Sequence, residues 1–346
     1  MTESSRVRVA VDVMGGDNGP RDIVAGALEA AGREPGEIEV VLVGDEAEIR
    51  GFLPKPDPRV AVSVVHCSEQ IGMAESAPSV YRRRKDASVV VATRLLAEHK
   101  VEAVVSAGNT GAVVTASLIG LGRVQGILRP AIAVVVPTPT GQTVLIDVGA
   151  NSEVKAVHLY QFAQMGRIYA QYVFDVPNPR VGLLNIGEES TKGSEVAQQA
   201  FQLLQNGREN LNFIGNVEGR DILRGTADIV ICDGFTGNVI LKFAESVVWM
   251  AVETTRREMA KNLKFKMGAL LLRPLLRRLK NRLNYEEYGG APLLGVNGIV
   301  IISHGRSSAK AIMNAVRVGA RSARMRIDHR IREEVSRDHR GEEASG

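Results

Sequence analysis

The chain has 346 residues, of which 45% are hydrophobic and 24% charged, with a formal net charge of +4. This composition is ordinary for a soluble globular enzyme, and two cysteines, Cys67 and Cys232, are too few for a disulfide framework or a structural zinc site. The sequence opens directly into a strand pattern and has no apolar run approaching 18 residues. We therefore expect no leader peptide, no membrane span and a cytoplasmic location.

Short apolar runs rich in β-branched residues alternate with helical patterns along the chain. Strands are predicted at 6–13, 38–45, 60–67, 101–108, 131–137, 143–149, 180–187, 212–217, 227–234 and 298–305. Helices are predicted at 21–32, 88–100, 156–174 and 193–207, and a long helix begins near Asn238. This alternation predicts a doubly wound, mostly parallel α/β sheet in one large domain, residues 1–325. The charged stretch 326–346 has few core residues and predicts a disordered tail.

The predicted strand ends share Gly, Asn and Asp residues, in loops at 12–20, 106–112, 147–151, 183–193, 214–221 and 233–238. A single loop of this kind is usually only a turn, but ligands of open α/β sheets bind beyond the carboxyl ends of the strands. Exposed N–H groups of such loops can hold an anion. The six loops together predict one polar, anion-binding crevice, with these candidate contacts: Asp12, Gly15, Gly16, Asp17, Thr110, Gly111, Asn151, Asn185, Asn216, Asp233 and Lys85.

Familiar catalytic motifs are missing from these loops. The sequence has no Gly-x-Gly-x-x-Gly fingerprint, no Walker motif, no serine nucleophile elbow and no metal-ligand spacing, so no cofactor is expected. Acyl transfer to phosphate fits this pattern, because a phosphate dianion can attack a thioester when the protein positions the reactants and stabilises the oxyanion. The candidate catalytic residues are Lys192, Asn109, His304 and Asn238. Lys192 can also be a surface charge and His304 a partner of a nearby carbonyl group.

Residues 240–285 are predicted to form the long helix and a basic amphipathic segment. Residues 261–282 contain eight Lys and Arg residues and no acid, so the rest of the chain carries −4 and is not a nucleic-acid binder. Apolar residues recur at helical spacing among these cations, which is typical of a membrane-surface contact. Carrier-protein docking and dimer packing remain alternatives, with these contact candidates: Lys264, Lys266, Leu270, Leu271, Arg273, Leu275, Arg277 and Arg278.

The ordered set of motifs resembles one known family. The motifs are VDVMGGDNGP, SAGNTGA, RPAI, LIDVGAN, GLLNIGEESTKGSE, NFIGNVEGRD, DGFTGNVILK and YGGAPLLGVNGIVIISHGRSS, across roughly residues 7–320. They resemble the bacterial phosphate acyltransferases of phospholipid synthesis. The resemblance implies a fold related to phosphate acetyltransferases and to isocitrate and isopropylmalate dehydrogenases. One departure is Ala77 before Pro78, where the family often has an acidic residue.

The same resemblance implies substrates and partners. It implies a homodimer whose substrates are a long-chain acyl carrier protein and inorganic phosphate. The acyl phosphate product would pass to a membrane acyltransferase that acts on glycerol 3-phosphate, which favours reversible contact with the inner face of the membrane.

Other functions remain open from the sequence alone. A short-chain phosphotransacetylase would use acetyl-CoA and would not need the basic apolar segment. An NAD-dependent dehydrogenase is disfavoured by the missing dinucleotide fingerprint. A catalytically silent membrane-surface scaffold would tolerate substitution of Asn109 or Lys192.

Overall fold

A computed structural model describes residues 6–17, 19–55, 57–72, 75, 83–139, 141–207, 211–262, 264–265, 267–268, 270–275 and 288–345. Eleven strands in this part of the chain form one continuous sheet in the order β3-β2-β1-β4-β11-β10-β5-β6-β9-β7-β8. They are β1 (Val7–Asp12), β2 (Ile38–Gly44), β3 (Ala61–His66), β4 (Ala103–Ser106), β5 (Ala131–Thr138), β6 (Gly141–Ile146), β7 (Val181–Leu184), β8 (Phe213–Val217), β9 (Ile229–Ile231), β10 (Ala291–Leu294) and β11 (Ile299–Ile302).

All ten predicted strands are present, and β10 is the strand that the sequence analysis missed. It is only four residues long and contains Pro292, so it carries too short a pattern to stand out from the glycine-rich residues around it. The two cysteines are buried and form no disulfide.

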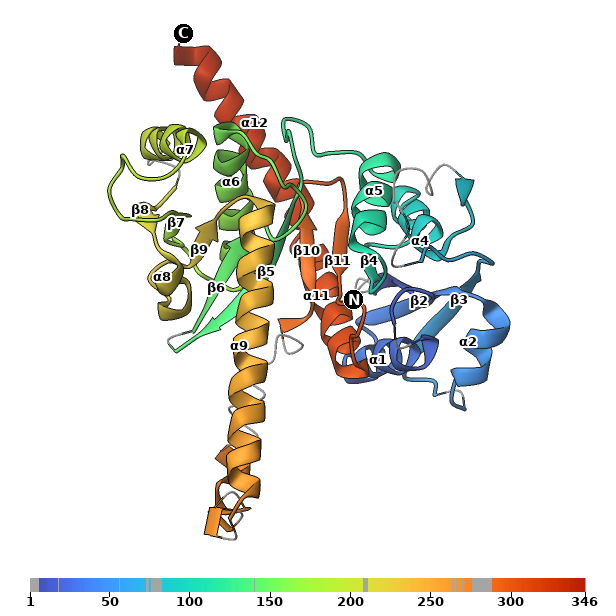
Figure 1. Ribbon diagram of the computed structural model, residues 1–346. Coiled ribbons are helices and arrows are strands. Elements are labelled where there is room, and N and C mark those ends of the chain that lie inside the picture. Colours follow the sequence, from blue (N-terminus) through green and yellow to red (C-terminus); the bar gives the residue numbers. More distant parts are fainter. Residues whose placement is uncertain are drawn as a thin grey trace.

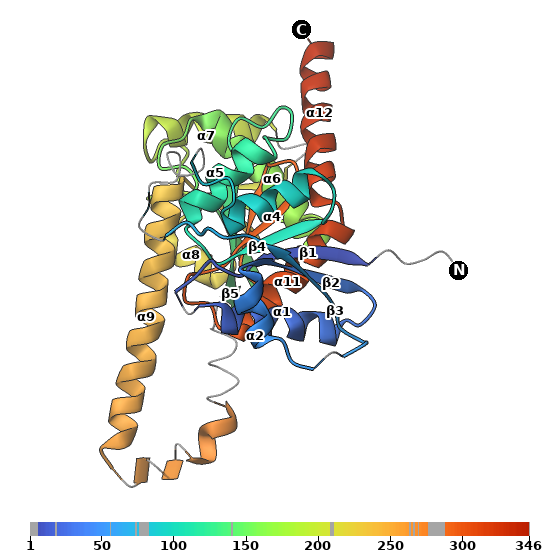
Figure 2. The same cartoon turned by 90° about the vertical axis from the view of Figure 1, so that its right-hand side faces the viewer.

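Helices pack on both faces of the sheet (Figures 1 and 2). They are α1 (Pro20–Arg33), α2 (Glu46–Phe52), α4 (Ser88–Ala97), α5 (Thr110–Gly120), α6 (Ala156–Val173), α7 (Glu195–Asn206), α8 (Gly219–Arg224), α9 (Gly234–Ala260), α11 (Ala309–Arg324) and α12 (Ile327–Ser345). Side chains of α1, α6, α7, α11 and α12 bury one apolar face, and side chains of α4, α5 and α8 bury the other. The doubly wound α/β prediction is therefore confirmed.

Strand direction reverses in the middle of the sheet. β3, β2, β1, β4 and β11 run parallel to one another. The next three pairings, β11–β10, β10–β5 and β5–β6, are antiparallel. β6, β9, β7 and β8 are again mutually parallel. Because three reversals separate the two sets, the carboxyl ends of β1, β4 and β11 point to one edge of the sheet and those of β6 to β9 point to the other.

The prediction of a disordered tail is wrong for the residues that form α12. Ile327, Ile331 and Val335 recur every four residues on one side of this helix and are buried in the core. Arg330 stacks over the ring of Tyr172 at 3.7 Å. Charged residues between the three apolar positions hide this stripe in the sequence.

Helix α9 begins at Gly234, earlier than predicted, and projects away from the sheet (Figure 1). It is long and apolar enough to cross a membrane by length and composition, which the sequence analysis did not anticipate, and only 6% of that apolar window is buried. Trp249 and Phe243 are among its exposed side chains. Helical turns continue to Leu275. The candidates Lys266, Arg277 and Arg278 lie outside the described residues.

Candidate functional site

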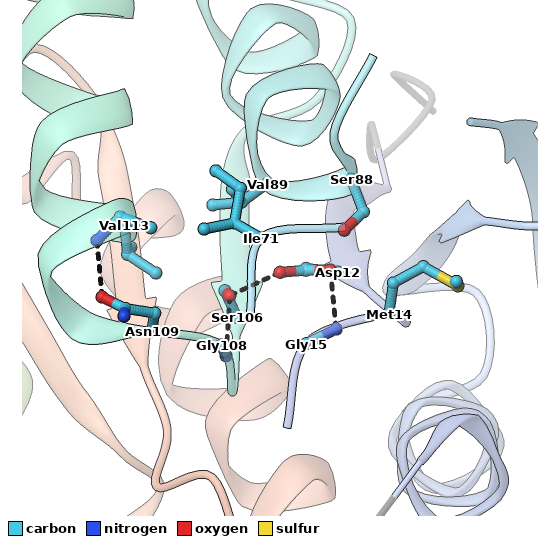
Figure 3. A pocket seen from close by; sticks show the side chains of 11 residues that line it. Asp12, Met14, Gly15, Ile71, Ser88, Val89, Ser106, Gly108, Asn109 and Val113 are labelled. Carbon is cyan, nitrogen blue, oxygen red and sulfur yellow. Dashed lines mark hydrogen bonds between the residues drawn. The ribbon is translucent and has the colours of Figure 1, made fainter. Parts of the chain in front are cut away.

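A buried carboxylate organises the loops that follow β1 and β4. Asp12 is 2% exposed, and its Oδ2 accepts a hydrogen bond from the Ser106 hydroxyl at 2.6 Å. Its Oδ1 accepts from the Gly15 N–H at 3.0 Å, and the Ser106 Oγ accepts from the Gly108 N–H at 3.1 Å. Burial raises the pKa of Asp12, and hydrogen bonds from Ser106 and Ser88 oppose that rise. The two serine hydroxyls flank the carboxyl group (Figure 3).

A small cavity of about 10 Å³ opens beside this carboxylate, about the least space that can hold one water molecule. It is lined by Asp12, Met14, Gly15, Ile71, Ser88, Val89, Ser106, Gly108, Asn109, Ala112 and Val113. We call the loops after β1, β4 and β11 the Asp12 group. Hydroxyl, carboxyl and carboxamide groups therefore share one hollow at the carboxyl ends of these strands.

Asn109 is the N-cap of α5. Its Oδ1 accepts from the Ala112 N–H at 3.0 Å, and its Nδ2 lies 3.3 Å from the Glu75 carbonyl oxygen. Thr110 and Gly111 form the exposed first turn of α5, and no hydrogen bond of their N–H groups is found in the described part of the chain. Such first-turn N–H groups carry partial positive charge and can bind an anion or an oxyanion.

The loop after β11 packs on the loop after β1. The Asp17 N–H donates to the Gly305 carbonyl at 2.6 Å, and a side chain at Gly16, whose φ is +105°, would lie 3.1 Å from the same oxygen. His304 is exposed in this loop, and its Nδ1 accepts from the Arg306 N–H at 3.1 Å. Lys85 is exposed on the segment that leads into α4. The candidates on β1, β4 and β11 are thus brought together.

A second buried carboxylate, Asp147, organises the loops after β6 and β9, which we call the Asp147 group. Asp147 is 0% exposed and accepts N–H hydrogen bonds from Ile132 at 3.0 Å, Gly149 at 3.2 Å and Ala150 at 3.1 Å. It also accepts from the backbone N–H of Asn151 at 2.8 Å and from the Asn151 Nδ2 at 2.9 Å. Burial raises the pKa of Asp147, and these donors oppose the rise.

The first turn of α9 packs directly against the Asp147 group. Asp233 caps the helix, accepting from the Thr236 N–H at 2.8 Å and from the Thr236 hydroxyl at 2.7 Å. A Cβ atom at Gly237 would lie 1.9 Å from the Asp147 carbonyl oxygen, so only glycine fits there. Asn238 is half-buried, with its Cγ 3.9 Å from the Cβ position of Gly149. The side chains of Asp233 and Asn151 therefore hydrogen-bond to backbone groups of the protein itself.

Lys192 is exposed on the loop between β7 and α7. Asn185 Nδ2 donates to the Lys192 carbonyl at 3.0 Å, and Asn216 Nδ2 donates to the Glu189 carbonyl at 2.8 Å. Gln198 Nε2 donates to the Thr191 carbonyl at 2.8 Å. Three carboxamides thus fix the shape of the Lys192 loop, residues 185–193.

The prediction of a single crevice is wrong. The strands that lead into the Asp12 group run opposite to those that lead into the Asp147 group and the Lys192 loop, so the six loops do not share one edge of the sheet. The sequence analysis also missed three organising residues: Asp147, Ser88 and Ser106. Asp147 had a recognisable sign, since it follows an apolar strand just as Asp12 does.

Solved structures place the fold in a known class. A phosphotransacetylase from Streptococcus pyogenes aligns with a TM-score of 0.60 and 16% identity over 92% of this chain and 94% of that chain. The EutD phosphotransacetylase from Staphylococcus aureus gives a TM-score of 0.57 with the same coverage. A 4-hydroxythreonine-4-phosphate dehydrogenase from Klebsiella pneumoniae gives 0.54 over 92% of this chain and 100% of that chain. The chain therefore has the α/β fold that these enzymes share.

Sequence comparison narrows the class to a family. The family model described as "Fatty acid synthesis protein" matches residues 7–330. A phosphate acyltransferase from Heliobacterium modesticaldum is 51% identical over 95% of this chain and 98% of its own length. A phosphate acyltransferase from Moorella thermoacetica is 50% identical over 91% of this chain and 92% of its own length. The chain belongs to this fatty acid synthesis protein family, and the resemblance seen in the sequence is confirmed.

Proposed function

We propose that this chain transfers a long-chain fatty acyl group from an acyl-carrier-protein thioester to inorganic phosphate. The observation that carries the proposal is the match of residues 7–330 to the family, with phosphate acyltransferases about half identical over nearly the whole chain. The acyl phosphate product would serve phospholipid synthesis through a membrane acyltransferase that acts on glycerol 3-phosphate. The proposed location is the cytoplasm, at the inner face of the membrane.

The reaction needs positioning more than acid–base catalysis. An oxygen of the phosphate dianion attacks the thioester carbonyl carbon, a C–O bond forms, and the C–S bond breaks as its electron pair leaves on the carrier thiolate. Stabilising the oxyanion is the main task left to the protein. The Asp12 group is the proposed reaction centre, because its hollow adjoins the first turn of α5. There, the N–H groups of Thr110 and Gly111, together with Asn109, would face the oxyanion.

The remaining catalytic candidates have separate places in the proposal. His304 lies on the Asp12 group and would donate to the incoming phosphate. Lys192 and Asn238 follow strands of the opposite direction and would hold the second reactant or its carrier. Substitutions at the two edges of the sheet therefore test different parts of the reaction.

Asn109→Ser tests the proposed centre. Serine keeps an oxygen that can cap α5, so the helix start is preserved while both carboxamide donors are lost. We expect kcat for acyl phosphate formation to fall about 100-fold, the usual cost of removing one oxyanion donor. The matched control is Asn212→Ser, since the half-buried Asn212 side chain donates only to the Asn178 carbonyl among the described contacts. Full activity in Asn109→Ser would remove the Asp12 group as the reaction centre.

We also propose that the exposed apolar surface of α9 and of the helical turns that follow it binds other molecules. Trp249 on α9 is 68% exposed, and Leu271 beyond it is 81% exposed. Exposed apolar side chains on this scale are typical of interaction surfaces. In this proposal α9 packs against its copy in a homodimer. The turns carrying Lys264, Leu270, Arg273 and Leu275 contact anionic lipid or the acidic carrier.

Two measurements test these surfaces separately. Light scattering during gel filtration should give the mass of a dimer, and Trp249→Glu should shift it to that of a monomer. Co-sedimentation with vesicles should require anionic lipid and weaken when Leu270 and Leu271 are both replaced by serine. A monomeric wild type would contradict the dimer, and equal binding of all vesicles would contradict the lipid contact.

A further inference from the structure

A cluster of basic side chains outside the candidate residues lies at the start of α6. It consists of Arg129 two residues before β5, Lys155 before α6 and His158 in the first turn of α6. Burial, followed by the charges of Arg129 and Lys155, lowers the pKa of His158. The geometry agrees, because the Lys155 N–H donates to His158 Nδ1 at 3.1 Å and the Leu128 N–H donates to Gln161 Oε1 at 2.9 Å, which brings the segment of Arg129 to the same end of α6. We call these three residues the Arg129 cluster.

Among the described residues, no acidic side chain pairs with the cations of this cluster. Neither Arg129 nor Lys155 makes an ion pair within the ranges of the chain that the structure describes, although both are exposed. Glu153, two residues before Lys155, pairs with neither of them there. The nearby Asp147 carboxylate is occupied by five N–H donors. Two exposed positive charges with no acidic partner among the described residues match a group that carries two negative charges.

The backbone that carries Arg129 is fixed on both sides. The Leu128 N–H donates to the Gln161 Oε1 at 2.9 Å, and the Pro130 carbonyl accepts from the Asn151 Nδ2 at 2.8 Å. Gln161 and Asn151 are both buried, and Gln161 lies one helical turn after His158. A guanidinium presented from a fixed backbone loses less freedom on binding than one on a mobile loop, so the cluster is arranged for a ligand.

His158 supplies a directed donor. It is 8% exposed, and its Nδ1 accepts from the Lys155 N–H at 3.1 Å. In the neutral imidazole the proton then resides on Nε2, for which no hydrogen bond is found among the described contacts. The Nε2–H is thus available to an oxygen acceptor.

We propose that Arg129, Lys155 and His158 form a binding site for a phosphate group. The site rests on the proposed function, because that reaction offers two sources of the same chemistry. One source is inorganic phosphate, and the other is the phosphate that joins the pantetheine arm to the carrier protein. Arg129 binds two phosphate oxygens with its planar fork, Lys155 adds charge, and the His158 Nε2–H donates to a third oxygen.

Direct titration of inorganic phosphate into the full chain, followed by calorimetry without an acyl donor, tests the site. We expect Arg129→Ala and Lys155→Ala each to weaken phosphate binding about 10- to 100-fold, as for the loss of a charge-assisted hydrogen bond. Arg129→Lys should fall between wild type and Arg129→Ala, because it keeps charge and loses the fork. Arg33→Ala is the matched control, since Arg33 pairs with Glu29 on the surface of α1 and should leave binding unchanged.

Steady-state kinetics with two donors separates the two phosphate sources. The donors are an acyl-phosphopantetheine thioester and the acyl-pantetheine thioester that lacks the phosphate. If the arm occupies the site, Arg129→Ala raises KM for the first donor alone. If inorganic phosphate occupies it, the variant raises KM for phosphate with both donors. Unchanged phosphate affinity and unchanged KM values in folded Arg129→Ala and Lys155→Ala would overturn the site.

The site and the proposed function fail in different ways. A wild-type chain that binds phosphate through Arg129 but forms no acyl phosphate would contradict the proposed function and keep the site. If the wild-type chain forms acyl phosphate and Arg129→Ala has the same kinetics, the proposed function stands and the phosphate site is rejected.

Discussion

The Asp12 and Asp147 groups are built on the same plan and differ in what surrounds the carboxylate. Each buried Asp lies at the end of an apolar strand and accepts hydrogen bonds from a glycine-containing loop. The neighbouring strand, β4 or β9, leads into a helix whose start is capped by a side chain. Among the described contacts, Asp147 accepts hydrogen bonds only from N–H groups, and α9 packs against its backbone at Gly237. Asp12 instead meets two rotatable hydroxyl groups and a cavity of about 10 Å³.

This difference indicates separate roles. Fixed N–H donors and close backbone packing make the Asp147 group a rigid support for the start of α9. The water-sized hollow beside Asp12 and the two rotatable hydroxyl groups make the Asp12 group less tightly packed than the Asp147 group. Substitutions that are costly in one group should therefore be mild in the other.

The largest expected effect comes from filling the contact between α9 and the Asp147 group. Gly237→Ala places a Cβ 1.9 Å from the Asp147 carbonyl oxygen, so we expect a loss of about 3 kcal/mol in the free energy of unfolding. Denaturant unfolding measures it. Gly51→Ala on α2 is the matched control, because no atom lies within 4 Å of its Cβ position. That variant should be neutral or gain about 0.5–1 kcal/mol.

The next effect compares the two carboxylates directly. In Asp147→Asn an NH₂ group replaces an acceptor that faces N–H donors, so we expect a loss of about 2–4 kcal/mol. In Asp12→Asn the serine hydroxyls can rotate to accept from the new NH₂, so the loss should be about 1 kcal/mol. Equal losses measured in parallel urea titrations would contradict the proposed difference between the groups.

The pH dependence of stability sharpens the comparison at Asp12. Its pKa in the folded chain is raised above the ordinary 3.8, so the folded state holds the proton more tightly than the unfolded state. The stability that Asp12 contributes is present below pH 3.8 and is lost as pH rises through the raised folded value. Asp12→Asn should flatten this fall when unfolding free energies are measured from pH 4 upward. A slope identical to wild type would show that Asp12 has no raised pKa.

The smallest expected effect concerns the Lys192 loop. Asn185→Ala removes the hydrogen bond to the Lys192 carbonyl, with an expected cost of about 1 kcal/mol. Trypsin should then cleave after Lys192 faster than in wild type, because the loop opens more often. Asn212→Ala serves as the control, since its half-buried side chain donates to the Asn178 carbonyl, outside the Lys192 loop. Cleavage at the wild-type rate would show that Asn185 does not hold this loop.

Most of the fold could be predicted because strands buried on both faces appear as continuous apolar runs. The sequence analysis missed the reversal of strand direction in the middle of the sheet, although the sequence contains evidence for it. The predicted strands 131–137 and 143–149 are joined by only five residues, too few for the crossover that a parallel pair requires. Recognising that hairpin would have introduced one reversal, but the short β10 supplies the other two and carries no clear pattern.

Only part of the arrangement of the candidate residues could be predicted from the sequence, because that arrangement depends on how the loops pack. Residue type identifies Asn and Asp at strand ends, but their hydrogen-bond partners depend on the packed loops. Asn185 and Asn216 hold carbonyl groups of the Lys192 loop, and Asp233 caps α9. The Arg129 cluster escaped notice because Arg129 lies 26 positions before Lys155 and 29 before His158, and it meets them only where α6 packs against the segment before β5.

The most direct test of the central claim is thioester consumption by the purified chain with palmitoyl carrier protein, measured with and without inorganic phosphate. The account predicts phosphate-dependent release of free carrier, an acyl phosphate that hydroxylamine traps, and a loss of about 100-fold in Asn109→Ser. A folded chain that consumes no thioester when phosphate is present, or consumes it at the same rate without phosphate, would contradict the proposed acyl transfer.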